Sequence, residues 1–199
     1  MKIALTGGIA CGKSTLAKFL TELGIRVLDA DDVVHELEAP GGTAVPAIQA
    51  AFGSDVVDSA GGVDRARLAA IVFADAERRR RLEAILFPMV RQRLLDFVSG
   101  AAEGLRIAVI PLLFESHWEG DYDTILAIAS PQEVQVDRMM RTRGYTRAQA
   151  EARLAAQMPV AEKAARADFA VMNDSTPGHL QEQAERLVAW LKERIEHEH

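Results

Sequence analysis

Short apolar runs alternate with longer amphipathic stretches along most of the chain. The apolar runs are bounded by glycine or charged residues and predict strands at residues 2–6, 25–28, 106–110, 123–129 and 167–172. The stretches between them have helical periodicity, and helices are predicted, among others, at 15–23, 32–37 and 178–196. Because strands and helices alternate, we expect an α/β fold: a five-stranded parallel sheet flanked by helices, with ligands at the carboxyl ends of the strands.

A segment of different character separates the second and third predicted strands. It begins at residues 40–43 (Pro-Gly-Gly-Thr) and predicts helices with few strand-like runs up to about residue 104. We therefore expect an inserted helical subdomain at 40–104, a core formed by 1–39, 105–135 and 160–199, and a helical lid at 136–159. The arginines at 78–81 lie in the insertion and fit either a solvated helix face or a surface that attracts phosphate.

The most informative motif follows the first predicted strand. Residues 7–15 read Gly-Gly-Ile-Ala-Cys-Gly-Lys-Ser-Thr and match the phosphate-binding pattern G-x-x-x-x-G-K-[ST]. Glycines let backbone N–H groups approach phosphate oxygens, and the next helix offers its positive N-terminal end to the same anion. Lys13 is placed for the β- and γ-phosphates and the Ser14 hydroxyl for Mg²⁺. The motif predicts a nucleotide-binding loop formed by Gly8, Ile9, Ala10, Cys11, Gly12, Lys13, Ser14 and Thr15.

Acidic residues follow the second predicted strand, at the same edge of the sheet. Asp29 and Asp31 would lie on one side of the chain if the strand geometry continued. Both residues fit a general base or a ligand of Mg²⁺, and both also fit the cap and first turn of the next helix. His35, one turn further on, fits a surface or packing position as well as a substrate contact. Many phosphate-loop enzymes carry a magnesium-shell Asp after a later strand, where this chain has Pro111. That acid must then come from Asp31, Asp29 or Glu115.

The predicted helix that starts after residues 130–131 carries Arg138 and Arg141, three positions apart on one face. Arginines in a mobile helical hairpin can close over a triphosphate and neutralise charge on the transferring group. Ion pairs with neighbouring surface acids are the alternative interpretation.

Composition narrows the class of protein. A chain of 199 residues suits one domain with insertions, and 49% hydrophobic with 26% charged residues is ordinary for a globular protein. The net charge of −6 disfavours a general nucleic-acid surface, and no apolar run reaches the ~18 residues of a membrane span. We therefore expect a cytoplasmic monomer or small homo-oligomer with no nucleic-acid or membrane partner.

The single cysteine, Cys11, excludes an internal disulfide framework. It lies among loop N–H groups beside Lys13, an environment that lowers a thiol pKa. We therefore expect thiol reagents to inactivate the protein.

Several stretches together resemble the dephospho-CoA kinase family over nearly the whole chain. They are the phosphate loop at 6–15, Asp-Ala-Asp at 29–31 followed by Val34 and His35, and the insertion signals at 40–41, 52–53, 62–65 and 82–83 with Pro88. They continue with Val-Ile-Pro-Leu-Leu-Phe-Glu at 109–115, Gln135 with Arg138 and Arg141, Arg153 with Gln157, and Ala-Asp-Phe at 167–169 with Asn173. The chain departs from the family pattern at Phe87, Ala10 and Cys11, where His, Gly and Ser are usual, and at 174–175.

The resemblance implies ATP-dependent phosphorylation of the ribose 3′-hydroxyl of dephospho-CoA, the last step of coenzyme A synthesis, with ATP and Mg²⁺. It implies that the inserted helical subdomain binds CoA. By position it implies Asp31 as the base, catalytic roles for Lys13, Arg138 and Arg141, and a magnesium shell of Ser14 and Asp31. It also implies a nucleotide contact at Asn173 and substrate contacts at Asp31, His35, Leu113, Phe114 and Glu115.

Three other functions of phosphate-loop proteins can be compared with this expectation. Another phosphate-loop nucleoside or nucleotide kinase would share all these parts and differ only in its acceptor. A regulatory GTPase usually carries Asn-Lys-x-Asp after a late strand, whereas Asp174 directly follows Asn173 here. A nucleic-acid-dependent ATPase is disfavoured by the acidic balance and by the lack of interleaved aromatic and basic residues.

Overall fold

The computed structural model describes residues 1–73, 75–100 and 104–197. Its strands are β1 (Ile3–Gly7), β2 (Arg26–Asp29), β3 (Arg106–Val109), β4 (Thr124–Ala129) and β5 (Phe169–Met172). Its helices are α1 (Lys13–Glu22), α2 (Ala30–Glu38), α3 (Val45–Phe52), α4 (Arg65–Phe73), α5 (Ala76–Ser99), α6 (Gln132–Arg143), α7 (Arg147–Ala155), α8 (Val160–Arg166) and α9 (Pro177–His197), with short 3₁₀ turns at Ser54–Val56 and Glu119–Asp121.

The strands form one sheet in the order β2-β3-β1-β4-β5. Strand β1 pairs in parallel with β3 and β4, and β4 pairs in parallel with β5. All five predicted strands are confirmed, with ends that differ by a residue or two, and so is the predicted parallel sheet. Every residue of β1 is buried, as expected for the central strand of a parallel sheet.

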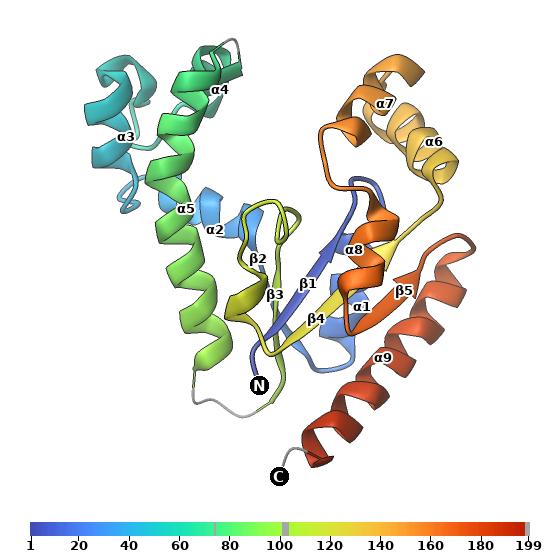
Figure 1. Cartoon of the computed structure of the whole chain (residues 1–199). Helices are drawn as coiled ribbons and strands as arrows, with labels where there is room; N and C mark the ends of the chain where they lie inside the picture. The colour runs from blue at the N-terminus through green and yellow to red at the C-terminus, as the bar shows by residue number, and fades with distance from the viewer. Residues whose placement is uncertain (74, 101–103, 198–199) are drawn as a thin grey trace. The chain divides into compact units, whose positions relative to one another are not determined.

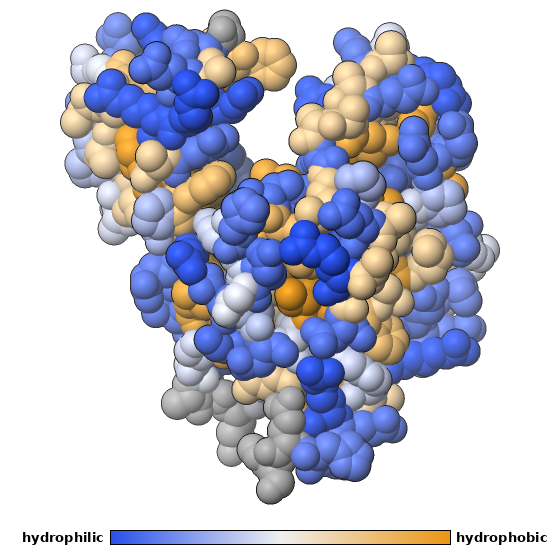
Figure 2. All heavy atoms as spheres, in the orientation of Figure 1, coloured by the Kyte–Doolittle hydropathy of each residue, from blue (hydrophilic) through white to orange (hydrophobic). Residues whose placement is uncertain are grey.

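Helices cover the sheet around this central strand (Figure 1). Helix α1 packs against α9 and β1, and α8 packs against β4 and β1. The main hydrophobic core joins these layers and includes Ile3, Leu16, Leu126, Val171 and Leu187. The exposed positions of α9 are mostly polar or charged, which is the hydrophilic side of this helix visible in Figure 2.

The chain divides into two compact units: Met1–Leu28 with Phe97–His199, and Asp29–Asp96. The first unit contains the whole sheet apart from the end of β2. The second unit is helical, as predicted for the insertion, and has buried side chains of its own, among them Val33, Ile48, Val56, Leu68 and Leu94. The division into a core, a CoA-binding subdomain and a lid stays a prediction.

An ion pair ties two helices of the second unit together. Arg65 Nε in α4 lies 2.9 Å from Oε2 of Glu38 in α2, and the Glu38 side chain is only 6% exposed. Burial raises the pKa of the Glu38 carboxyl, although the Arg65 charge acts to lower it. The backbone carbonyl oxygen of Glu38 also accepts a hydrogen bond from Val63 N.

Within the described ranges, no helix is both long and apolar enough to cross a membrane.

Candidate nucleotide-binding and phosphoryl-transfer site

The predicted phosphate loop connects β1, which ends at Gly7, to α1, which begins at Lys13. Gly12 precedes the helix with φ 92°, a left-handed conformation that favours glycine, and a Cβ at this position would collide with Nδ2 of Asn173. Ala10 also has a positive φ, 57°, although it carries a Cβ. Helix α1 has no side-chain cap and no acidic residue in its first turn, so its positive end is available to an anion.

The two side chains that the motif assigns to phosphate and metal lie at the start of α1. Lys13 Nζ donates to the carbonyl oxygens of Gly7 and Gly8, both at 2.8 Å. Ser14 and Thr15 are exposed in the first turn of the helix. The ammonium group is thus held at the loop itself, within reach of an anion bound there.

Two side chains from distant parts of the chain donate to carbonyl groups of this loop, and a third, Ser130, holds one of them in place. Asn173 Nδ2 donates to the carbonyl oxygen of Cys11 at 2.8 Å, and Arg138 donates to that of Ala10 at 3.2 Å. Arg138 also donates to the Asn173 carbonyl oxygen at 3.2 Å, and Ser130 Oγ donates to the same oxygen at 2.6 Å. These hydrogen bonds hold the backbone of the loop in place before it binds a ligand.

Two glutamines hold the other side of the loop. Gln135 Nε2 donates to the carbonyl oxygen of Ile9 at 2.6 Å, and Ile9 N donates to Gln157 Oε1 at 3.3 Å. A Cβ at Gly8 would lie only 2.7 Å from Gln135 Nε2, so Gly8 permits this close approach. These glutamines and Ser130 were not among the predicted site residues, and the only sequence signal for Gln135 and Gln157 was the family resemblance.

The two predicted arginines of the lid are placed differently. Arg138 is half-buried against the loop, whereas the Arg141 side chain is 76% exposed and pairs with Asp137 at 3.2 Å. Both lie on α6, which packs against α7 as a helical hairpin. The structure therefore does not bring the two guanidinium groups together, and their joint role in catalysis stays a prediction.

The predicted lowering of the Cys11 thiol pKa is wrong. The Cys11 side chain is fully buried, and burial raises the pKa of the thiol, an effect that outweighs the lowering by the Lys13 charge. The nearby charge and the helix end are visible in the sequence, whereas the desolvation depends on distant parts of the chain. A buried, protonated thiol does not fit the expected ready inactivation by thiol reagents.

Asp29, Asp31 and His35 belong to the second unit, and each is described within it. Asp29 is the N-cap of α2, because its Oδ1 accepts a hydrogen bond from Asp31 N at 2.9 Å. Asp31 and His35 are exposed, Asp31 in the first turn of the helix and His35 in its last. Capping by Asp29, one of the two interpretations left open by the sequence, is confirmed.

The predicted substrate residues after β3 form a tight helical turn. His117, with φ 55°, ends it: His117 N donates to the Phe114 carbonyl oxygen at 3.1 Å and Trp118 N to that of Leu113 at 3.0 Å. This is the Schellman pattern, and the left-handed residue is a histidine where glycine is usual. The Leu113 and Phe114 side chains are buried, so they hold the turn in the core, and their contact with a substrate stays a prediction.

Glu115, the last residue of the predicted set, is bonded within the protein. Its Oε1 lies 2.7 Å from Lys163 Nζ in α8 and accepts a hydrogen bond from Met158 N at 3.0 Å. Its second oxygen, Oε2, is buried with no hydrogen-bond partner in the described part of the chain. Lys163 contacts a residue of the predicted site but was not itself predicted from the sequence to belong to it.

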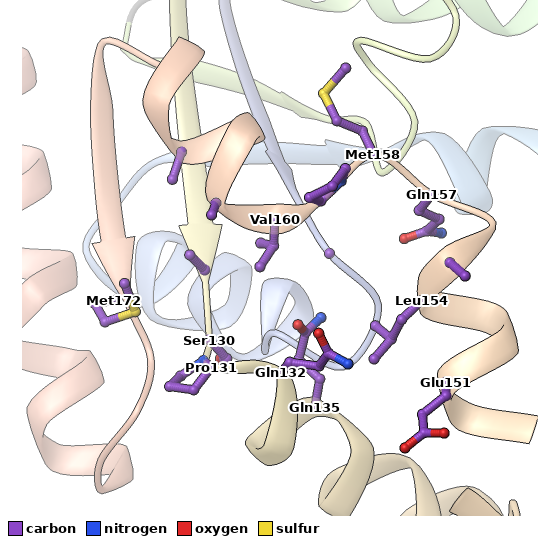
Figure 3. Close-up of a pocket in the computed structure, with 16 residues that line it drawn as sticks. Ser130, Pro131, Gln132, Gln135, Glu151, Leu154, Gln157, Met158, Val160 and Met172 are labelled. Atoms are coloured by element: carbon purple, nitrogen blue, oxygen red, sulfur yellow. The ribbon is translucent and has the colours of Figure 1, made fainter. Parts of the chain in front are cut away.

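A cavity of about 570 Å³ lies behind the loop. It is lined by the end of β4, the starts of α6 and α8, and the α7–α8 connection, and Figure 3 shows Gln135, Leu154, Gln157 and Val160 around it. Its lining is mostly apolar and includes Gly8, but neither Lys13 nor Ser14. In the described ranges, no three His, Cys, Asp or Glu side chains gather as a metal site.

A phosphate loop between the central strand of a parallel five-stranded sheet and the next helix defines the class: a nucleotide-binding protein of the phosphate-loop type. Comparison with known proteins narrows this class. The family model described as dephospho-CoA kinase matches residues 1–178. The chain is 46% identical to a dephospho-CoA kinase of Anaeromyxobacter dehalogenans over 193 residues, which cover 96% of this chain and 92% of that protein.

Solved structures agree with this result. A crystal structure of a Thermus thermophilus protein matches with a TM-score of 0.79 and 36% identity over 96% of this chain and 97% of that one. A dephospho-CoA kinase from Campylobacter jejuni has the same fold, with a TM-score of 0.67 and 24% identity over 94% and 96% of the two chains. The chain therefore belongs to the dephospho-CoA kinase family. The family, enzyme class and phosphate-loop fold predicted from the sequence are confirmed.

Proposed function

We propose that this chain transfers the γ-phosphoryl group of ATP to the ribose 3′-hydroxyl of dephospho-CoA, giving coenzyme A and ADP. The observation that carries the proposal is the preformed loop at Gly8–Thr15, with Lys13 Nζ already held at its carbonyl groups. Family membership supports the acceptor, and the fixed loop supports the phosphate donor. In such transfers the protein mainly positions the reactants and stabilises charge, which is what a fixed loop can do.

The residues of the first unit divide this work. Backbone N–H groups of the loop and the positive end of α1 bind the phosphate oxygens. Lys13 exchanges its carbonyl acceptors for oxygens of the β- and γ-phosphates, so its charge reaches the group being transferred. Arg138 keeps the loop in place through Ala10 and Asn173, while Arg141, exposed on the α6–α7 hairpin, is free to swing toward a bound triphosphate.

The residues present fit Mg²⁺. Ser14 offers a hydroxyl in the exposed first turn of α1, and the described residues contain no cluster of three acids. A single hydroxyl suits Mg²⁺, which keeps several waters and is held by substrate phosphates with one or two protein ligands. An ion held there would supply positive charge to the phosphate oxygens. We assign Ser14 and Asp31 as the residues that hold it directly or through water.

Asp31 is the residue proposed to accept the proton of the 3′-hydroxyl. It follows β2, at the edge of the sheet where the strands have their carboxyl ends, and its side chain is exposed. Asp29 cannot serve equally well, because its carboxylate already caps α2. His35, Leu113 and Phe114 are proposed to shape the acceptor site. Monomeric or small homo-oligomeric state and cytoplasmic location stay predictions.

The deciding experiment measures ADP release with dephospho-CoA, adenosine and AMP offered separately as acceptors. Turnover with dephospho-CoA alone supports the proposal, and a preference for adenosine or AMP contradicts it. The variant Lys13→Ala should lower kcat by several powers of ten, because it removes charge from the transferring group. Lys18→Ala is the matched control. This lysine lies in the same helix, its side chain is 74% exposed, and it forms an ion pair with Glu22. Near-normal kcat in folded Lys13→Ala would overturn the assignment of the loop.

A further inference from the structure

A fully buried lysine connects two parts of the first unit. Lys163 lies in α8 with 0% of its side chain exposed, and its Nζ lies 2.7 Å from both the Pro111 carbonyl oxygen and Glu115 Oε1. The Pro111 carbonyl also accepts a bond from Thr6 Oγ1 in β1, at 3.3 Å. A buried ammonium group is costly unless it is paired and hydrogen-bonded, so this arrangement holds α8 firmly to the turn after β3.

The carboxylate of this pair also holds the backbone of the next connection. Glu115 Oε1 accepts a hydrogen bond from Met158 N at 3.0 Å, and Met158 lies in the connection between α7 and α8 (Figure 3). Arg166 of α8 makes two further contacts: its guanidinium lies 4.1 Å from the centre of the Phe114 ring in the same turn, and it pairs with Glu119, in the following 3₁₀ turn, at 2.7 Å. The end of the α7–α8 connection is therefore attached to a buried, rigid turn.

The residue before Met158 reaches the phosphate loop. Gln157 Oε1 accepts the hydrogen bond from Ile9 N, and Ile9 is a loop residue whose carbonyl oxygen is held by Gln135. Adjacent residues cannot move far independently, because a peptide unit has only two soft dihedral angles per residue. The position of Met158 therefore sets the position of Gln157, and Gln157 sets the direction of one N–H group of the loop.

We infer that Glu115 and Lys163 are positioning residues: they fix the α7–α8 connection, and through Gln157 they fix Ile9 of the phosphate loop. The inference rests on the proposed function, in which that loop binds the phosphates of ATP. It assigns Glu115 a task different from the substrate contact or magnesium ligand expected from the sequence. Glu115 acts through Met158 and Gln157, on the geometry of the nucleotide site.

A double-mutant cycle tests this relay. Glu115→Gln removes the charge that holds Lys163, and Gln157→Leu removes the acceptor for Ile9 N while keeping a side chain of similar size. Each variant should lower kcat/KM for ATP by roughly tenfold to a hundredfold, the effect of a small misplacement of reacting groups. If Glu115 acts through Gln157, the double variant should be no worse than the poorer single variant.

The matched control is Glu119→Gln, which breaks the ion pair between α8 and the 3₁₀ turn that begins at Glu119. Among the described residues, Glu119 bonds to no backbone group of the α7–α8 connection, and its partner Arg166 reaches only the Met158 sulfur there, at 3.8 Å, so the effect of Glu119→Gln should multiply with that of Gln157→Leu. Lys163→Arg should keep most activity because it keeps the buried cation and its donors, whereas Lys163→Met should resemble Glu115→Gln. If Lys163→Met does not fold, the cycle between Glu115 and Gln157 decides alone.

Two results would overturn the inference. Multiplying effects of Glu115→Gln and Gln157→Leu would show that Glu115 acts independently of the relay. A large rise in the Mg²⁺ concentration needed for half-maximal activity, or in the KM for dephospho-CoA, confined to Glu115→Gln, would make it a metal or substrate ligand. Failure of the proposed function would appear separately, as lack of turnover of dephospho-CoA by the unmodified chain.

Discussion

The side-chain amide of Asn173 donates a hydrogen bond to the carbonyl oxygen of Cys11 at 2.8 Å, which joins the end of β5 to the phosphate loop. Asn173 is itself buried, and its own carbonyl is held by Ser130 and Arg138. The family resemblance implied a nucleotide contact at Asn173, but the structure shows it supporting the loop that would receive the phosphates. If Asn173 supports the loop, its loss should also destabilise the free protein, whereas the loss of a nucleotide contact alone should not.

Asn173→Ala should lower the stability of the free protein and its affinity for ATP together. In the part of the chain that the structure describes, the variant leaves the buried Cys11 carbonyl with only a long contact to Ser130, 3.5 Å away. An unsatisfied buried polar group costs about 1–3 kcal/mol. Urea unfolding and ATP titration measure the two effects. Asp174→Ala, at the exposed neighbouring position, is the control and should change neither. Lower ATP affinity at unchanged stability would mean that Asn173 serves the nucleotide alone.

The Cys11 thiol should react slowly with an aromatic disulfide reagent at pH 7–8 and rapidly in denaturing urea. Its side chain is fully buried and its raised pKa keeps the proton on sulfur, which removes the reactive thiolate. Since the chain has one cysteine, the absorbance of the released thiol reports Cys11 alone. A Gln181→Cys variant, with a thiol at an exposed position of α9, should add one rapidly reacting group. Rapid labelling of the folded, unmodified chain would contradict the buried position.

Asp31→Asn should lower kcat with dephospho-CoA by ~10²–10⁴ and leave ATP affinity little changed, because Asn keeps the shape of the side chain but cannot accept the proton. Asp29→Asn should cost less, since asparagine is as good an N-cap as aspartate for α2. Both variants are measured at saturating Mg²⁺. If Asp29→Asn is the less active of the two, the base has been assigned to the wrong residue. Loss of ATP binding in Asp31→Asn would place its main role at the metal.

Glu38 should make the protein less stable as pH rises through the acidic range. Burial raises its pKa above the ordinary value of 4.5, so the folded state keeps the proton to higher pH than the unfolded state. Between the ordinary and the raised pKa the folded state binds more protons, and the free energy of unfolding therefore falls with increasing pH. Urea unfolding at several pH values should show that the advantage of the unmodified chain over Glu38→Gln shrinks as pH rises from 4 to 7.

The partner of Glu38 offers an internal check on this prediction. Arg65 acts to lower the pKa of Glu38, so its removal in Arg65→Met should raise that pKa further. The loss of stability with rising pH should then extend to higher pH than in the unmodified chain. An advantage over Glu38→Gln that grows with pH would instead show that the ion pair outweighs the burial.

Local patterns predicted the strands and the phosphate loop, because both depend on residues that are neighbours in the sequence. The supports of the loop could not be predicted in this way: Ser130 and Gln135 contact residues 119 and 126 positions away. Periodicity says which face of a helix is buried but not which backbone group a side chain on that face will meet. Only the family resemblance pointed to Gln135 and Gln157, and nothing pointed to Ser130.

Burial of charged and reactive groups was the other limit. For Cys11 the sequence correctly suggested that Lys13 lowers the pKa, but desolvation by distant side chains is the larger effect. Lys163 looks like an ordinary surface lysine in a short amphipathic helix, yet it is fully buried because Glu115 and the Pro111 carbonyl meet it there. Both outcomes depend on packing between segments that the sequence does not place side by side.

The burial of the one native cysteine has a practical consequence for studying motion. A protein whose own thiol is shielded can carry reporter groups without first being made cysteine-free, so the phosphate loop need not be altered. Cysteines introduced at Ala148, on the hairpin, and at Glu36, in the second unit, occupy exposed positions and would accept a donor and an acceptor dye. The energy transfer between them, followed while ATP and then dephospho-CoA are added, would report in solution how the distance between the two labelled positions changes when each ligand binds.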